Sequence, residues 1–166
     1  MQKHDVNEEN RALRLRPATS EDDPFLRSLF ASTRSDELTL MNWDENQKEA
    51  FITMQFDAQR RCYPESDDSI ILSNEVPVGR IAVARTEAVI LLVDIALLPE
   101  YRRAGIGTNL LRGLLQEAIS VGKPVRLHAL TASAAVPLYE RLGFRRMGVD
   151  AGYLEMMWFP PVSQSS

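Results

Sequence analysis

The sequence predicts an α/β protein in which helices cover a layered sheet. Three observations support this class: an alternating strand near the start, several amphipathic helical segments, and a glycine-bearing loop between a long apolar strand and a helix. The predicted order over residues 12–159 of the 166 is β-α-α-β-β-β-α-β-α-β-β.

The first strand and the first two helices follow from local signals. Residues 12–16 alternate between apolar and charged side chains, and Pro17 closes this strand. Ser20 is expected to cap the next helix, and Pro24 suits its first turn. A second helix is expected over residues 45–61. The residues expected to face inward on this second helix are Ala50, Phe51, Met54 and Phe56.

Turn residues divide the rest of the chain into short strands and two further helices. The central helix starts near Ile106 and ends at Gly122, a glycine cap that Pro124 follows as a stop. A shorter helix contains Tyr139. The strands are expected at residues 69–73, 76–85, 89–98, 125–130, 144–149 and 153–159.

Composition narrows the classes of function. A net charge of −4 without a lysine-rich run argues against a nucleic-acid partner. No apolar stretch is long enough to span a bilayer, so no membrane partner is expected. The single cysteine, Cys62, is expected to be a packing thiol, and two separated histidines give no metal site. A cytoplasmic location is the resulting expectation.

The segment Pro99–Thr108 has the features of a phosphate cradle. It leads from an apolar strand into a helix N-terminus, where the first backbone N–H groups have no intrahelical partner. Gly105 and Gly107 lack a Cβ, so a phosphate oxygen can approach the main chain. Arg102 and Arg103 add charged, forked donors. The alternative interpretation is an ordinary strand-to-helix turn with two solvated arginines.

The spacing of glycines and arginines distinguishes between the known phosphate-binding loops. The segment lacks the Walker pattern, and Leu110 stands where a dinucleotide fingerprint needs a third small residue. The pattern Arg102-x-x-Gly105-x-Gly107 instead resembles the acyl-CoA loop of the GCN5-related N-acetyltransferase (GNAT) superfamily.

A second motif supports the same resemblance. The family's helix signature is Asn-x-x-Ala-x-x-Leu-Tyr-x-x-x-Gly-Phe, and both its order and its separation from the loop agree with this chain. The residues that match it are Ala135, Leu138, Tyr139, Gly143 and Phe144. The family's asparagine falls on Ala132 or Ser133, so the Ser133 hydroxyl is expected to replace it beside the cofactor. Pro137 implies that the helix begins near Ala134 or bends just before Tyr139.

The resemblance implies a three-layer GNAT fold with a mixed central sheet that splays between the fourth and fifth strands. It implies one GNAT domain over residues 12–159. The polar residues 1–11 are expected to form a flexible tail, and residues 160–166 a C-terminal tail. It also implies acetyl-CoA as co-substrate, without a metal. The expected cofactor-binding residues are Ile95, Ala96, Leu97, Arg102, Arg103, Ala104, Gly105, Ile106, Gly107, Thr108, Ser133 and Tyr139.

Acyl transfer to an amine also needs an acid and a base. Tyr139 matches the family tyrosine that lies near the thioester sulfur, which makes it the expected general acid. The alternative is a tyrosine whose ring only packs the helix against the sheet. The base is open among Asp94, the one carboxylate inside an apolar strand, His128 and ordered water. Asp94 could also be structural, accepting hydrogen bonds from an arginine or from the backbone.

The leading hypothesis is an N-acetyltransferase that acts on a primary amine of a small molecule or peptide. The alternatives are a catalytically silent acyl-CoA sensor and a protein-modifying acyltransferase. Acidic residues from Asp36 to Glu45 suit a cationic amine, although carboxylates at helix ends are the simpler explanation. A monomer–homodimer equilibrium is also expected, because the last strands carry apolar residues. These residues are Met156, Met157 and Trp158.

Overall fold

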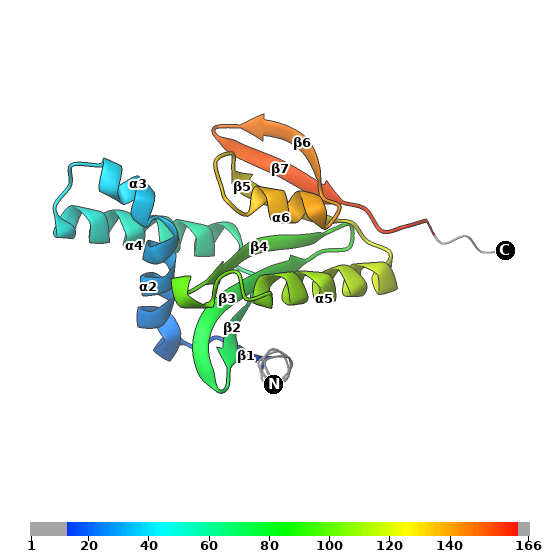
Figure 1. Cartoon of the computed structure of the whole chain (residues 1–166), viewed down its shortest axis with the longest axis horizontal. Helices are drawn as coiled ribbons and strands as arrows, with labels where there is room; N and C mark the ends of the chain where they lie inside the picture. The colour runs from blue at the N-terminus through cyan, green and yellow to red at the C-terminus, as the bar shows by residue number, and fades with distance from the viewer. Residues whose placement is uncertain (1–12, 163–166) are drawn as a thin grey trace. The chain divides into compact units, whose positions relative to one another are not determined.

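A computed structural model describes residues 13–162, apart from the side chains of Asp36 and Glu37 (Figure 1). The predicted tail over residues 1–11 therefore lies outside the described residues, as do residues 163–166. The first elements in chain order are β1 (Leu13–Pro17), the 3₁₀ turn η1 (Ser20–Asp22), α2 (Asp23–Thr33), α3 (Ser35–Leu40) and α4 (Glu45–Cys62). Then follow β2 (Asp67–Ser73), β3 (Val76–Arg85), β4 (Ile90–Leu97), the 3₁₀ turn η2 (Pro99–Tyr101) and α5 (Ile106–Val121). The last elements are β5 (Val125–Leu130), α6 (Val136–Arg141), β6 (Arg145–Asp150) and β7 (Tyr153–Trp158).

The strands form a mixed, open sheet in the order β1-β2-β3-β4-β5-β7-β6. β1 pairs antiparallel with β2, and β7 pairs antiparallel with both β5 and β6. The parallel register between β4 and β5 covers Ile90–Leu92 against Val125–Leu127, whereas β4 continues to Leu97 and β5 to Leu130. The predicted α/β class with a mixed sheet is confirmed.

The chain forms two compact units, and the first contains residues 13–82 and 94–104. Its core lies where α2 and α4 pack together and against the strands, with Phe30 edge-on to Phe56 at 5.7 Å between ring centroids. Burying such side chains stabilises the unit through the apolar area that leaves water. The core residues are Leu26, Phe30, Leu38, Ile52, Phe56, Ile70 and Leu72.

The second unit contains residues 83–93 and 105–162. α5 buries one apolar stripe and ends at Gly122, which has a left-handed backbone and donates its N–H to Ala118 and Ile119, as predicted. β5 pairs with β7 along its whole length, from Val125 opposite Trp158 to Leu130 opposite Tyr153. The buried stripe of α5 consists of Ile106, Leu111, Leu114, Leu115 and Ala118.

Two predictions about the helices of the first unit are wrong in part. In α4, Phe56 is buried and Phe51 packs against the core, as predicted. Ala50 and Met54 are exposed instead, and the second buried residue is Ile52, four residues before Phe56 on the same stripe. Thr19, not Ser20, precedes the first helical turn, because Asp22 three residues later accepts the Thr19 N–H at 2.8 Å.

Two further expectations about side chains are also wrong. Cys62 ends α4 as an exposed free thiol and is not packed. Met156 is fully buried in β7, because it lies opposite Leu127 on the covered face of the sheet. It is therefore no part of an exposed apolar surface.

Candidate active site

The loop after β4 is held to the first unit by Arg102. Its Nε donates to the carbonyl oxygen of Leu97 at 3.0 Å, and Nη2 donates to Ser32 Oγ at 3.5 Å. The main chain turns at the same place, since Tyr101 N–H donates to Leu98 O at 2.9 Å. Arg102 thus fixes the path of the loop, while its side chain stays exposed.

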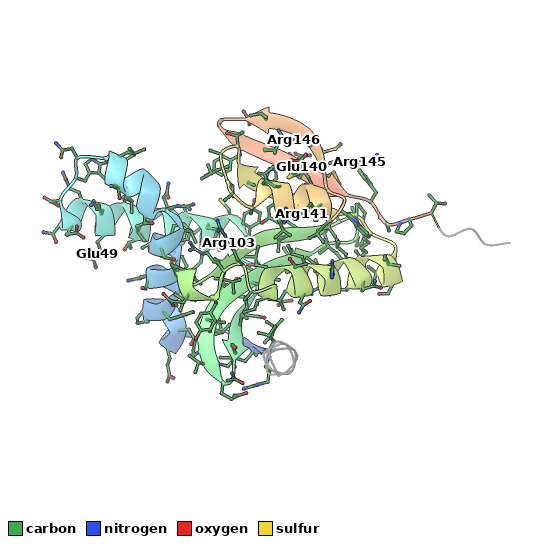
Figure 2. All side chains as sticks on the ribbon, in the orientation of Figure 1. Glu49, Arg103, Glu140, Arg141, Arg145 and Arg146 are labelled. Atoms are coloured by element: carbon green, nitrogen blue, oxygen red, sulfur yellow. The ribbon has the colours of Figure 1, made fainter. Side chains whose placement is uncertain are left out.

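Gly105 stands at the N-cap of α5 in a left-handed conformation, with φ 84° and ψ 0°. Only glycine and, less often, Asn or Asp adopt this region readily. A Cβ built on Gly105 would meet no described atom within 4 Å, so open space faces this position. Arg103 also has a positive φ of 64° and is exposed in the same loop, where Figure 2 labels it.

The first turn of α5 has no capping side chain at Gly105. The Gly105 carbonyl accepts from Asn109 N–H at 3.0 Å, which is the first bond of the helix. The N–H groups of Ile106, Gly107 and Thr108 precede that bond and are the groups that an α-helix leaves without an intrahelical partner. With the positive end of the helix dipole, they can bind an anion.

The end of β4 packs closely on β3 because Gly79 has no side chain. A Cβ at Gly79 would overlap the Ala96 carbonyl oxygen and lie 2.8 Å from Leu97 Cδ2. Leu98 N–H donates to Val78 O at 2.8 Å, which holds the two strands together at this point. The main chain of Ile95, Ala96 and Leu97, predicted to contact the cofactor, therefore has a rigid backing on the β3 side.

Asp94 belongs to a charged cluster around Arg80. The Arg80 side chain is only 3% exposed and donates from Nη1 to Asp94 Oδ2 at 3.0 Å and from Nη2 to Asp68 Oδ1 at 3.1 Å. Nη1 also donates to Gln59 Oε1 at 2.8 Å. Asp94 thus accepts a hydrogen bond from a buried arginine. This contact agrees with the structural alternative that the sequence left open for Asp94. Its side chain still keeps 26% exposure.

Burial raises the pKa of Asp94 above its ordinary value. The charges of Arg80 and Arg34 act in the opposite direction, as do hydrogen bonds from Arg80 and from the Ile95 N–H. The proton affinity of this carboxylate therefore depends on how far the two arginines offset its desolvation.

His128 lies on β5 directly opposite Glu155 of β7, with Nε2 3.5 Å from Glu155 Oε2. Both side chains are about two-fifths exposed, at 41% and 39%. This geometry gives His128 a nearby carboxylate and contact with solvent.

Tyr139 lies in α6, which begins at Val136 with Pro137 in its first turn. The Tyr139 side chain is buried and meets the Phe144 ring edge-on, at 5.7 Å between centroids. Ser133 precedes this helix, and its Oγ accepts the Ala135 N–H at 3.2 Å. The Ser133 hydroxyl thus helps to shape the turn into α6. On the surface of the same unit, Arg146 pairs with Glu140 at 2.9 Å (Figure 2).

The sequence interpretation missed Arg80 and the glutamine that supports it. A signal for Arg80 was present, because it is the one charged residue between Val76 and Ala84, in an otherwise apolar strand. Such a charge requires a partner of opposite sign when it is buried. Asp94 in the next strand is a carboxylate with the same requirement.

Comparison with known proteins identifies the family. A model described as the Acetyltransferase (GNAT) family matches residues 25–144. The chain belongs to this family. The GNAT match includes the loop around Gly105 and ends at Phe144, the last residue of the helix signature. No curated protein matches the chain.

Solved GNAT structures share the fold. The PaiA N-acetyltransferase of Thermoplasma acidophilum, solved with coenzyme A, has a TM-score of 0.70 at 17% identity, covering 89% of this chain and 98% of its own. The ribosomal-protein-S18-alanine N-acetyltransferase of Escherichia coli has a TM-score of 0.64 at 18% identity, with coverages of 93% and 98%. YncA of Salmonella typhimurium, solved with acetyl-CoA, has a TM-score of 0.55 at 18% identity, with coverages of 93% and 97%.

Within residues 13–162, none of the helices combines the length and the apolar character that a bilayer crossing requires. In the same part of the chain, no three His, Cys, Asp or Glu side chains are grouped so that they could hold a metal ion.

Proposed function

We propose that this GNAT protein transfers the acetyl group of acetyl-CoA directly to a primary amine of a small molecule or peptide. The observation that carries the proposal is the uncapped first turn of α5, where a glycine leaves backbone donors open toward an anion. The family match supports acyl transfer as the reaction.

In this proposal the first turn of α5 binds the pyrophosphate of acetyl-CoA, and the loop arginines add charge. The pantetheine arm follows the main chain at the end of β4, and a backbone N–H there polarises the acetyl carbonyl. The short parallel register of β4 supports this role, because the segment Ile95–Leu97 lies beyond it. The residues that would hold the co-substrate are Ile95, Ala96, Leu97, Arg102, Arg103, Ala104, Gly105, Ile106, Gly107, Thr108, Ser133 and Tyr139.

The chemical step is an attack of a neutral amine on the acetyl carbon. The new N–C bond forms, the C–S bond breaks, and the amine nitrogen loses one proton. The departing thiolate takes a proton from the Tyr139 hydroxyl, which is the general acid of the proposal. The proton from the amine goes to Asp94, His128 or ordered water, and these three remain the candidates for the base.

Replacing Tyr139 by Phe tests the acid role, because the change keeps the ring and deletes only the hydroxyl. Loss of one positioned acid lowers kcat by about 10²–10⁴-fold. The dissociation constant of acetyl-CoA should change less than about fivefold, since the phosphate and main-chain contacts remain. Steady-state kinetics and calorimetry measure the two quantities. Tyr153→Phe, at an exposed tyrosine of β7, is the matched control. Full turnover by Tyr139→Phe would reduce Tyr139 to a packing residue.

A thiol-release screen with acetyl-CoA and a panel of amines tests the function itself. The proposal expects amine-dependent release of CoA and a mass increase of one acetyl group in the amine. Tight binding of acetyl-CoA without release by any amine would instead indicate the sensor function. Acetylation of proteins only would indicate the protein-modifying alternative.

Two finer predictions belong to the same proposal. The first is a cytoplasmic location. The second is a monomer–homodimer equilibrium, for which the exposed apolar residues of the last hairpin now matter instead of Met156. These residues are Met147, Val149 and Tyr153. Light scattering over a concentration series measures the mass, and a constant monomer mass would exclude the dimer.

A further inference from the structure

Two side chains of opposite charge are held by one face of α4. Gln55 and Gln59 are four residues apart, so they share a face and lie about 6 Å apart along the helix axis. Gln55 Oε1 accepts from Arg34 Nε at 2.7 Å. Gln59 Oε1 accepts from Arg80 Nη1 at 2.8 Å, and that nitrogen also donates to Asp94. α4 therefore positions Arg34 directly and Asp94 through Arg80.

The aromatic core beneath these groups continues the connection. The Arg34 guanidinium lies over the Phe30 ring, 4.1 Å from its centroid. Phe30 meets Phe56 edge-on at 5.7 Å, and Arg80 Cζ is 5.8 Å from the Phe56 centroid. Both arginines thus lie on one aromatic pair, which fixes their orientation. The two charged groups are thus held by contacts within the first unit.

Arg34 forms no ion pair with a carboxylate of the described residues, although its charge acts on Asp94. Its Nε is committed to Gln55, and no described side chain forms an ion pair with its guanidinium. The side chain is half-buried, where an unpaired charge is costly. A forked guanidinium whose terminal nitrogens are not used by Gln55 suits a carboxylate ligand.

The Asp94 cluster has the opposite imbalance. One guanidinium, Arg80, serves the two carboxylates Asp68 and Asp94, so the three side chains together carry one net negative charge. Asp94 is the more exposed of the two carboxylates, at 26% against 22%. A cationic ligand group beside Asp94 would balance this charge.

We infer that Arg34 and Asp94 together bind the acceptor, and that the acceptor is a free α-amino acid. Its carboxylate accepts hydrogen bonds from Arg34, and its amino group donates to Asp94. The inference rests on the proposed function, whose amine it specifies. Arg34 then determines specificity, and Arg80 positions Asp94. The reaction balances as before. The α-ammonium group first loses one proton, and the neutral nitrogen then attacks the acetyl carbon, loses a second proton and keeps the acetyl group as the C–S bond breaks. Both protons go to Asp94, His128 or water.

Matched ligands test this inference. The twenty amino acids are compared with their counterparts that lack the carboxylate, such as cadaverine for lysine, histamine for histidine and ethylamine for alanine. The assay is CoA release from acetyl-CoA by the intact protein. At least one amino acid should have a kcat/KM about 100-fold above that of its counterpart, the value of one lost charged hydrogen-bonded contact.

Variants of Arg34 locate the effect. Arg34→Gln should raise KM for that amino acid at least tenfold and should lower the kcat/KM ratio of the amino acid to its decarboxylated counterpart at least tenfold. Arg34→Lys should restore part of the preference, because it keeps the charge and loses the fork. Arg27→Gln, at an exposed arginine of α2, the helix that ends just before Arg34, is the matched control. Circular dichroism and Tm report whether each variant folds.

The outcomes separate the inference from the proposed function. Equal turnover of amino acids and their counterparts would overturn the inference while the acetyltransferase stands. If no amine is acetylated, calorimetry with each amino acid decides. Binding that Arg34→Gln weakens at least tenfold would support the amino-acid site without catalysis. Absence of binding by all twenty would overturn it.

Discussion

The N-termini of α4 and α5 differ in how the backbone N–H groups of their first turn, which have no intrahelical partner, are satisfied. In α4 the Asp44 carboxylate accepts the Gln47 N–H at 2.8 Å, and the Gln47 side chain accepts the Asp44 N–H at 3.0 Å. In α5 the equivalent position is Gly105, which has no side chain to offer. One terminus is closed by its own residues, and the other leaves its donors to an outside group.

The difference distinguishes a structural helix end from one that we propose binds an anion. A capping box satisfies two backbone donors and stabilises the helix, so nothing further is needed there. An N-terminal glycine contributes less to stability and admits close approach of an anion. The acidic residues Asp44 and Glu45 are explained by the closed terminus and a 3.6 Å contact to Lys48. They are helix-end carboxylates, the simpler of the two explanations, whereas the side chains of Asp36 and Glu37 lie outside the described residues.

Closing the open terminus should have the largest effect. Gly105→Asp places a negative charge where the pyrophosphate is expected and should weaken acetyl-CoA binding at least about 100-fold, or roughly 2.7 kcal/mol. Gly105→Asn is the matched control, because Asn has the same size, tolerates the same backbone and carries no charge. Its affinity should stay within about tenfold of wild type. Calorimetry measures both, and equal affinities for the two variants would mean that no anion binds here.

The start of η1 is also closed by a side chain of its own, and the pH dependence of stability tests the contribution of that side chain. The Asp22 carboxylate accepts the Thr19 N–H and pairs with Arg16 at 2.8 Å, and these contacts hold the pKa of Asp22 well below its ordinary value. A lowered folded-state pKa gives stability that is complete above the unfolded value of about 4 and is lost as pH falls further.

Asp22→Asn should therefore lower Tm at pH 7. The Tm difference between wild type and this variant should shrink as pH falls from about 4 to about 2. Acetyl-CoA binding at pH 7 should not change. Thermal unfolding over a pH series gives the result. A Tm difference that is constant across this range would show that the carboxylate charge does not contribute.

Opening the closed terminus of α4 should have the smallest effect. Asp44→Ala removes the cap and should reduce the free energy of unfolding by about 1 kcal/mol. A protein of this size then loses about 2–4 °C in Tm. Its acetyl-CoA affinity should remain within about twofold. A loss of affinity comparable to that of Gly105→Asp would remove the distinction between the two termini.

Much of the fold could be predicted because local residues determine where many of its helices and strands end. Gly122 and Pro124 end α5 where expected, and β5 matches its predicted bounds at residues 125–130. The short helix α3 was missed, since it has six residues and depends on packing that buries Leu38. The inward face of α4 was predicted correctly at Phe56 but not at Met54, because tertiary contacts decide which apolar residues are covered.

The candidate site likewise has a part that could be predicted from local sequence and a part that could not. The loop from Pro99 to Thr108 is contiguous, so its residues could be identified from spacing alone. The cluster around Arg80 depends on pairing between strands and on a glutamine from a distant helix. Such a partnership cannot be read from neighbouring residues, although an unexplained charge in each of two apolar strands indicates that one exists.

We propose above that the open N-terminus of α5 binds the pyrophosphate of acetyl-CoA. Titration of ¹⁵N-labelled protein with acetyl-CoA, followed by amide NMR, observes the N–H groups in question. We expect the largest shifts at Ile106, Gly107 and Thr108, and none at the first turn of α4, residues 45–47. Saturation by acetyl-CoA with unmoved resonances at Ile106–Thr108 would contradict it.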